Sequence, residues 1–232
     1  MGKFIVIEGL DGAGKSTQIK LLLDYFHNKG IETKFIHFPR TEKIGVYGDL
    51  IAKFLRGEFG PIEAVHPQLV ALIFALDRFD FSNTIKDWLH QGFTVLADRY
   101  VLSNIAFQCA KLKTPEEKKY LADWIFNYEF EFNKIPKPDL SIYLDVPFSF
   151  TQKSLNDNRT GNSRIYLKGK TDIHEDSISF QEQVRAEYES ILKKFYVLMR
   201  LDCSTSEGGM QNADQIHADI VSMFQKNISV VP

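Results

Sequence analysis

The chain has 232 residues, of which 44% are hydrophobic and 25% charged, and this suits one α/β domain with a complete core. The formal net charge of −2 excludes a global electrostatic attraction to nucleic acid or to a membrane surface. Two cysteines, Cys109 and Cys203, are too few for a disulfide framework and favour a reducing compartment. We therefore expect a cytoplasmic protein. A strand predicted directly at the N-terminus and the lack of a long apolar run predict neither a signal peptide nor a membrane span.

The first predicted strand, residues 3–8, leads directly into a glycine-rich loop, GLDGAGKST at residues 9–17. Apolar side chains then recur at helical spacing from Ile19 to Phe26, which predicts a helix. A strand, this loop and a helix in that order are the context of a P-loop, which binds a nucleoside triphosphate. Glycines let backbone N–H groups surround a phosphate, and the helix N-terminus adds partial positive charge.

The P-loop residues have distinct expected roles. The Lys15 amine can reach the β- and γ-phosphates of ATP, and the Ser16 hydroxyl can ligate Mg²⁺. The residues expected to contact ATP are Gly9, Asp11, Gly12, Ala13, Gly14, Lys15, Ser16 and Thr17. This motif predicts phosphate binding without specifying the reaction.

Strands and helices alternate along the remainder of the chain. Strands are expected at 33–38, 93–97, 140–144 and 196–201, and helices at about 50–55, 67–91, 102–110, 115–130, 148–156, 180–195 and 213–225. This alternation predicts a mostly parallel sheet with helices on both faces. Ligands of such sheets bind beyond the carboxyl ends of the strands, so the P-loop, Phe38-Pro39-Arg40, Asp98-Arg99-Tyr100 and Asp145 should meet at one edge.

Charged residues follow two of these strands. Asp98 could hold Mg²⁺ through water or orient an acceptor phosphate, and Arg99 could bind that phosphate. Arg40 could neutralise the phosphate being transferred. The alternatives are a structural ion pair at a strand end for Asp98 and Arg99, and a solvated arginine in a turn for Arg40.

Two further segments point to a nucleotide acceptor. Phe74 and Arg78 lie four apart in the long predicted helix, so a ring and a guanidinium share one face, as a planar base requires; alone, Phe74 would instead be interpreted as core. Residues 158–171 contain Arg159, Arg164, Lys168 and Lys170 without an acidic residue. This stretch is interpreted as a lid that closes over phosphates, with a solvated charged loop as the alternative.

Together these segments resemble the thymidylate kinase family over nearly the whole chain. The resemblance is carried by residues 4–17, Phe38-Pro39-Arg40, residues 74–78, and Asp98-Arg99-Tyr100 with Ser103 and Asn104. It implies one P-loop nucleoside monophosphate kinase domain over residues 1–232. The domain would hold a five-stranded parallel sheet, helices on both faces and a lid at about 157–175. It also implies transfer of the γ-phosphate from ATP to dTMP with Mg²⁺, in a homodimer.

The resemblance further implies roles at the acceptor site. Asp11 would contact the sugar 3′-hydroxyl, Phe74 would stack on thymine, and Phe107 would crowd the sugar 2′ position. Asn104 and Gln108 would lie near the base edge, and Tyr166 would approach the nucleotide when the lid closes. The remaining expected acceptor-site residues are Phe38, Arg40, Arg78, Arg99 and Ser103.

The lid is expected to supply a catalytic arginine. Some members of the family carry arginine where this P-loop has Gly12, and others supply the basic residue from the lid. This chain resembles the second kind, which makes Arg159 or Arg164 the expected donor. The residues leave two alternatives open: a kinase for another nucleoside monophosphate or a deoxynucleoside, and a non-catalytic P-loop binding module.

Overall fold

The computed structural model describes residues 2–41, 45–157, 166–168, 172–175, 177–194 and 198–228. Five strands form one sheet in the order β2-β3-β1-β4-β5, and all neighbouring strands run parallel. Their bounds are β1 Phe4–Gly9, β2 Thr33–His37, β3 Thr94–Asp98, β4 Leu140–Asp145 and β5 Leu198–Asp202. The predicted five-stranded parallel sheet is confirmed, although β1, β3, β4 and β5 end one residue later than predicted and β2 ends one residue earlier.

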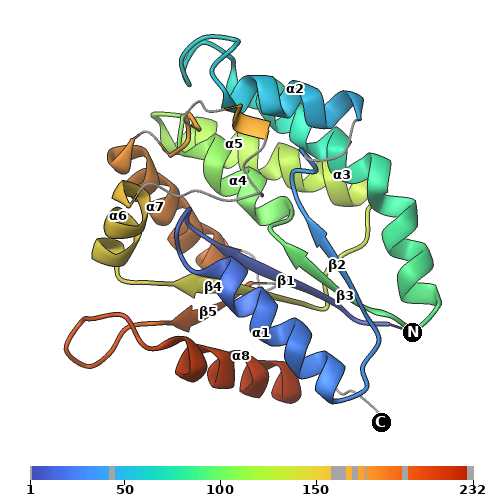
Figure 1. Ribbon diagram of the computed structural model, residues 1–232. Helices are drawn as coiled ribbons and strands as arrows, with labels where there is room; N and C mark the ends of the chain where they lie inside the picture. Colours follow the sequence, from blue (N-terminus) through green and yellow to red (C-terminus); the bar gives the residue numbers. More distant parts are fainter. Residues whose placement is uncertain are drawn as a thin grey trace.

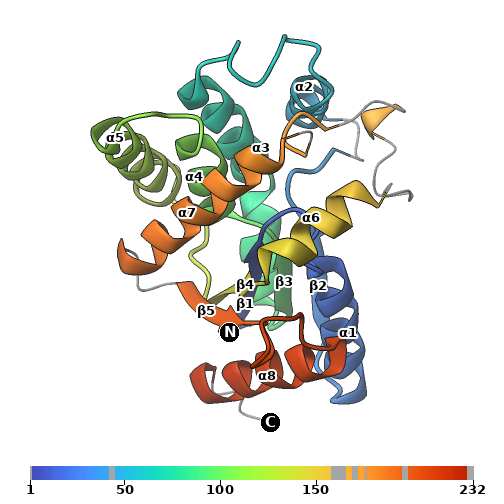
Figure 2. The same ribbon diagram turned by 90° about the vertical axis from the view of Figure 1, so that its left-hand side faces the viewer.

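Helices connect the strands and cover both faces of the sheet. Their bounds are α1 Lys15–Asn28, α2 Val46–Leu55, α3 Pro67–His90, α4 Val101–Cys109, α5 Pro115–Phe126, α6 Phe148–Asn156, α7 Ile178–Lys194 and α8 Ala213–Asn227. Helices α1 and α8 pack together on one face, while α3, α4 and α7 lie on the other with α5 outside α4 (Figures 1 and 2). No helix within the described ranges is long and apolar enough to cross a membrane.

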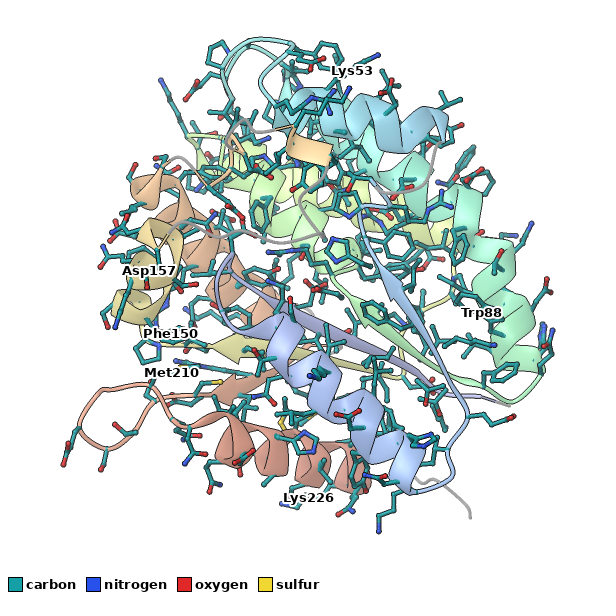
Figure 3. All side chains as sticks on the ribbon, in the orientation of Figure 1. Lys53, Trp88, Phe150, Asp157, Met210 and Lys226 are labelled. Atoms are coloured by element: carbon teal, nitrogen blue, oxygen red, sulfur yellow. The ribbon has the colours of Figure 1, made fainter. Side chains whose placement is uncertain are left out.

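The sheet centre is the core of the molecule. Strands β1, β3 and β4 are buried along their whole length, because helices cover both of their faces. Side chains from the helices fill the space on either side of the sheet (Figure 3). The rings of Tyr143 on β4 and Tyr188 on α7 stack with centroids 4.5 Å apart, which ties the last long helix to the sheet. The strand ends that carry the P-loop are therefore held on a rigid scaffold.

The segment after α5 differs from the prediction. One helix was expected from 115 to about 130, but the α-helix ends at Phe126 and a π-helical segment, η1 Asn127–Phe132, follows. The wider turn places the adjacent side chains Glu129 and Phe130 both in the interior, where they are 0% and 6% exposed. A buried carboxylate needs partners, and those of Glu129 lie on α3 and α4, beside the site described next.

Candidate active site

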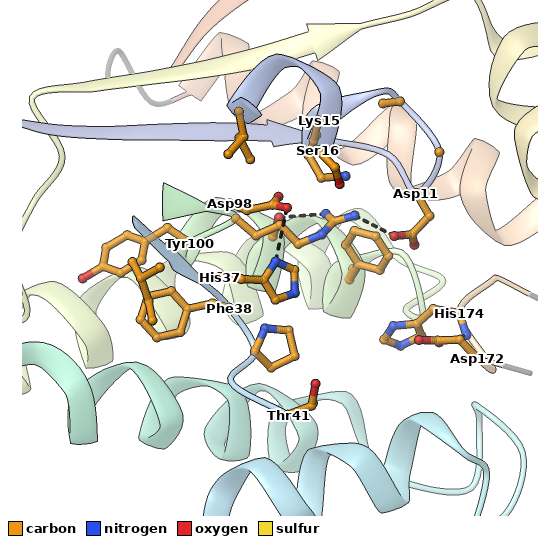
Figure 4. Close-up of a pocket in the computed structure, with 18 of the residues that line it drawn as sticks. Asp11, Lys15, Ser16, His37, Phe38, Thr41, Asp98, Tyr100, Asp172 and His174 are labelled. Carbon is orange, nitrogen blue, oxygen red and sulfur yellow. Dashed lines mark hydrogen bonds and ion pairs between the residues drawn. The ribbon is translucent and has the colours of Figure 1, made fainter. Parts of the chain in front are cut away.

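One cavity of ≈ 870 Å³ lies at the carboxyl ends of strands β1, β2 and β3. It is lined by the loop after β1, by the residues that follow β2 and β3, by α3 and α4, and by described residues between 166 and 175 (Figure 4). Every predicted site residue in the described ranges lines this cavity except Gly9. Arg159 and Arg164, the expected lid donors, lie outside the described residues.

The P-loop has the backbone geometry of a phosphate cradle. Gly12 and Gly14 have φ angles of 78° and 80°, in the left-handed region that favours glycine. Gly14 directly precedes α1, so the loop ends on the N–H groups of a helix start. The Lys15 Nζ donates to the carbonyl oxygen of Leu10 at 2.7 Å and lies 3.4 Å from that of Gly9. The amine is thus folded over the loop, at the same end as the helix N-terminus.

Arg99 occupies a strained backbone position between the P-loop and α4. Its φ of 66° is unusual for a residue with a side chain, which indicates a local constraint. The guanidinium donates to Asp11 Oδ1 at 2.7 Å and to Ser103 Oγ at 3.0 Å. Burial alone would lower the pKa of Arg99, but nearby carboxylates, led by Asp11, raise it above its ordinary value. A fixed cation therefore lies between the P-loop and the start of α4.

Asp98 ends β3 beside the P-loop. One carboxylate oxygen lies 3.2 Å from His37 Nδ1, whereas Oδ1 is buried without a partner in the described part of the chain. Burial would raise the pKa of Asp98, but the hydrogen bond from His37 and the charges of Lys15 and Arg99 outweigh it and lower the pKa. The lowered pKa thus favours Asp98 as an anion, and one of its oxygens has no partner among the described residues.

This arrangement suits a hard cation. Mg²⁺ prefers oxygen ligands and usually keeps several waters, with one or two protein groups and substrate phosphates completing its shell. The Asp98 carboxylate and the Ser16 hydroxyl both line the cavity, near Lys15 (Figure 4). No cluster of three His, Cys, Asp or Glu residues occurs among the residues that can be described, so a cage made only of protein ligands is not seen there. The residues present therefore fit Mg²⁺ held together with a nucleotide.

Arg40 lies at the cavity but is bound to α3. Its Nε donates to Asp77 Oδ1 at 2.9 Å, and its Nη2 donates to Asp80 Oδ2 at 2.6 Å. The guanidinium also packs over the Phe81 ring at 4.8 Å. Asp77 is 1% exposed, so this is a buried charge pair rather than a solvated arginine. The turn after β2 is fixed to α3 in this way.

Arg78, which directly follows Asp77 on α3, has a different partner from Arg40. Its Nε and Nη2 donate to the two oxygens of Glu129 at 2.6 and 2.7 Å, with both side chains buried. This bidentate geometry is the strong form of an arginine–carboxylate pair. Asn104 on α4 donates its Nδ2 to Glu129 Oε1 at 3.1 Å and to the Ala71 carbonyl at 3.0 Å. A charged network therefore lies behind the part of the cavity that Phe74 and Asn104 line.

Glu8, inside the first strand, stabilises the start of α4. Its carboxylate accepts from the backbone N–H of Tyr100 at 3.1 Å and of Ser103 at 3.3 Å, and also from the hydroxyls of Ser103 and Tyr188. Burial raises the pKa of Glu8, partly offset by these hydrogen bonds and by Arg99. No side chain of α4 itself caps this helix. Glu8 therefore takes the role of an N-terminal cap from a neighbouring strand.

The described residues of the expected lid, 166–168 and 172–175, lie along one side of the cavity. Tyr166 Oη donates to Asp172 Oδ2 at 3.1 Å, and the Ile173 N–H donates to the Leu55 carbonyl at 3.0 Å. This anchors the segment to the end of α2. In Figure 4 the Asp11 carboxylate points toward the region where His174 and Asp172 lie. Tyr166 lines the cavity, and its approach to the nucleotide stays a prediction.

Three ionisable groups near this segment have shifted pKa values. Burial, with the nearby charges of Asp11 and Glu175, raises the pKa of Asp172 to about 7. Burial lowers the pKa of Lys111 to about 7, although the charges of Asp172 and Glu63 oppose the shift. Burial also lowers the pKa of His174 well below its ordinary value. Buried groups with such shifts at a cavity are typical of functional sites.

Comparison with known proteins identifies the family. A family profile described as thymidylate kinase matches residues 7–212. The chain belongs to the thymidylate kinase family. The thymidylate kinase of Plasmodium falciparum (isolate 3D7) is 34% identical over 181 residues, 75% of this chain and 79% of that protein. The probable thymidylate kinase of Thermococcus gammatolerans is 32% identical over 234 residues, covering 98% of each chain.

A solved structure agrees with this assignment at the level of the fold. The thymidylate kinase of Candida albicans superposes with a TM-score of 0.71 at 24% identity, over 97% of this chain and 92% of that one. The similarity shows that the two proteins share their fold. The resemblance expected from the motifs is therefore confirmed for family and architecture.

Within this thymidylate kinase fold, several buried polar residues at the site were missed by sequence reasoning. Gln181 on α7 brackets Asp11: its Nε2 donates to Asp11 Oδ2 at 2.9 Å, and its Oε1 accepts from the Asp11 N–H at 3.3 Å. Local sequence offers one weak signal, which is a polar residue at an apolar position of the α7 pattern. The other missed residues are the buried Glu8, Glu129, Asp172 and His174 and the half-buried Lys111.

Proposed function

We propose that this chain transfers the γ-phosphate of ATP to dTMP, giving dTDP and ADP. The observation that carries the proposal is one cavity lined at one end by the P-loop and at the other by Phe74, Asn104 and Gln108. A phosphate cradle and a base-sized aromatic and amide surface thus face a common space. Family membership supports the same activity.

The mechanism follows from the charges at the centre of the cavity. The acceptor is already a phosphate monoester anion, so a strong general base is not required. The main obstacle is repulsion between two anions, and catalysis consists of positioning and charge neutralisation. Lys15 supplies positive charge at the P-loop and Arg99 supplies it beside Asp11. Mg²⁺, when bound with ATP, would neutralise phosphate oxygens beside Ser16 and Asp98.

The same cavity geometry supports the roles that we propose for residues on the acceptor side. Asp11, held by Arg99 and Gln181, would receive the sugar 3′-hydroxyl. Phe74 would stack on the base, and Phe107 would occupy the space that a 2′-hydroxyl needs. Arg40 would reach the transferred phosphate by exchanging part of its contact with Asp80, which is exposed, while keeping buried Asp77. A lid arginine, Arg159 or Arg164, would complete the positive charge around the transferred phosphate.

A panel of nucleoside monophosphates with ATP and Mg²⁺ tests the function. We expect ADP release to be fastest with dTMP, weaker with dUMP, and small with AMP and CMP. Because one methyl group contributes only about 1–3 kcal/mol of discrimination, dUMP should remain a detectable substrate. Faster phosphorylation of AMP than of dTMP would reject the proposal. Binding of ATP without transfer to any acceptor would instead indicate a non-catalytic module.

The lid donor has its own test. Arg159→Ala and Arg164→Ala should lower turnover unequally, because one arginine alone should contact the transferred phosphate in the closed lid. Two variants with unchanged turnover would exclude a catalytic arginine supplied by either position.

We also propose a homodimer. Its support is a set of large apolar side chains exposed on α3, α5 and η1, namely Leu69, Phe79, Tyr120 and Phe132. Such side chains often mark protein contacts when they form a patch. Light scattering should give twice the chain mass of 26.7 kDa, and a single species at 26.7 kDa would reject the dimer.

A cytoplasmic location is proposed on the state of the thiols. Cys109 and Cys203 are both buried and free. Burial raises the pKa of each thiol to about 12, so both thiols are unreactive as nucleophiles. Neither cysteine is used to stabilise the fold covalently, as is usual in a reducing compartment.

A further inference from the structure

Two amide side chains of α4 line the base end of the cavity. Asn104 and Gln108 are four residues apart and therefore lie on the same face of the helix. Each amide has a donating NH₂ end and an accepting oxygen end, and its orientation is set by its hydrogen-bond partners. The partners of both amides set these orientations.

Gln108 is oriented by a lysine. The Lys111 Nζ donates to Gln108 Oε1 at 2.8 Å, and it is held over the Phe54 ring at 4.7 Å. In its protonated form Lys111 has donors and no acceptor, so its bond to Gln108 Oε1 turns the Gln108 oxygen toward Lys111. The Gln108 Nε2 has no hydrogen-bond partner in the described part of the chain. The amide therefore offers its donor end to the cavity.

Asn104 has the opposite orientation. Its Nδ2 donates to the Ala71 carbonyl and to the Glu129 carboxylate, which are both acceptors. Its Oδ1 is buried and, among the described residues, has no partner. A buried acceptor without a partner is unfavourable in the free protein, and a ligand donor that reaches it would relieve this cost. Asn104 therefore offers an acceptor at the same end of the cavity.

We propose that Lys111 and Glu129 are positioning residues that set the polarity of the base-reading edge, with an acceptor at Asn104 and a donor at Gln108. The inference rests on the proposed function and deepens it. Thymine and uracil present a ring N–H donor beside carbonyl acceptors, which complements this edge. Cytosine presents a ring nitrogen acceptor beside an amine donor, which opposes it. Lys111 thereby acts against cytosine, because it prevents Gln108 from turning its oxygen toward the base.

The test measures nucleotide selectivity. Lys111→Met keeps an unbranched side chain over Phe54 but removes the donor. We expect the ratio of kcat/KM for dTMP to kcat/KM for dCMP to fall roughly tenfold in this variant, as for one mispaired polar group. Lys111→Arg retains a donor and should keep the ratio within about twofold of wild type. Lys113→Met, at an exposed lysine two residues away, is the matched control and should leave the ratio unchanged.

A second background separates positioning from packing. In Gln108→Leu, the further change Lys111→Met should leave the dTMP to dCMP ratio unchanged, because the amide that Lys111 orients is gone. An equal fall of the dTMP to dCMP ratio in the wild-type and the Gln108→Leu backgrounds would overturn the inference. Equal losses of kcat/KM for dTMP and for dCMP, which leave the ratio constant, would also overturn it and assign Lys111 a packing role.

The outcome is distinguishable from failure of the proposed function. Wild-type protein that does not phosphorylate dTMP would refute the function itself. Calorimetric binding of dTMP and dCMP to wild type and to Lys111→Met would still test the polarity of the edge. Indistinguishable affinity ratios in the two proteins would then reject the role of Lys111.

Discussion

The phosphate loop and the base end of the cavity differ in how far apart in the sequence their parts lie. The phosphate cradle comes from residues 9–17, and its Lys15 bonds to carbonyl oxygens five and six residues earlier. At the base end, Arg78 pairs with Glu129, 51 residues later, and Asn104 bonds to the Ala71 carbonyl, 33 residues earlier. The first end is built from local backbone and the second from long-range side-chain pairs. Substitutions at the first should affect turnover, and those at the second should affect folding or selectivity.

The largest effect is expected at Glu129. Glu129→Ala leaves the Arg78 guanidinium buried without its carboxylate, and breaking such a pair costs about 3–5 kcal/mol of unfolding free energy. Urea unfolding would measure the loss. Glu131→Ala, two residues away, removes an exposed partner of Lys137 and should leave the unfolding midpoint near wild type. Equal effects of the two substitutions would show that burial of the pair does not govern stability.

Lys15→Ala should separate function from folding. The cation at the P-loop would be lost, and turnover should fall by about 10²–10³-fold, as when one charge-stabilising group is removed from a transition state. The unfolding midpoint should change little, because the Lys15 amine donates to carbonyl oxygens of its own loop. Steady-state kinetics measure turnover, and thermal unfolding measures the midpoint. Lys29→Ala, at the exposed end of α1, is the control. Turnover within a few-fold of wild type would remove Lys15 from the mechanism.

The same contrast explains what the sequence could and could not predict. The P-loop, the parallel sheet and the strand ends at Arg40 and Asp98 follow from local motifs and from alternating apolar periods. Their positions around one cavity follow from the rule that parallel strands collect ligands at their carboxyl ends. These features need no information about which distant residues pair.

The sequence carries no such local signal for Glu129 and Lys111, which pair with distant residues. Glu129 lies in a stretch that predicts an ordinary helix, and the π-helical turn that buries it depends on packing against α3 and α4. Lys111 follows α4 in a polar loop, where a lysine is usually solvated. Its contact with Gln108 depends on where Phe54, on the distant α2, comes to lie. Pairings of this kind are set by tertiary structure, so residue type and spacing do not reveal them.

The pH dependence of stability should report on Asp172. Its pKa is raised from 3.8 to about 7, so the folded state holds a proton that the unfolded state releases between these values. Stability should therefore fall as pH rises from about 4 to about 7. For Lys111, whose pKa is lowered from 10.5 to about 7, the unfolded state binds more protons above pH 7, and stability should rise there. The two contributions together give a minimum near neutral pH.

Asp172→Asn isolates the acidic half of this profile. Between pH 5 and pH 8, the variant should gain about 2–3 kcal/mol of unfolding free energy relative to wild type, because the unfolded wild type ionises a carboxyl that folding keeps protonated, and the variant has no such group. Urea unfolding at the two pH values measures the difference. Asp157→Asn, at an exposed position, should show no such change. Parallel pH profiles for wild type and Asp172→Asn would place the titration elsewhere.

The smallest effect is expected at Phe74. Substitution of this residue compares the base end of the cavity directly with the phosphate loop. Phe74→Ala removes the ring proposed to stack on the base, and dTMP binding should weaken by about 1–3 kcal/mol while ATP binding is retained. Calorimetry with each nucleotide measures this. Phe59→Ala, which is 42% exposed and does not line the cavity, controls for loss of an aromatic side chain. Phe74 also packs against a buried cluster of Ile51, Phe54, Leu55 and Val70, and a collapse of that cluster would weaken the binding of both nucleotides equally. Only unequal losses assign the ring to the base.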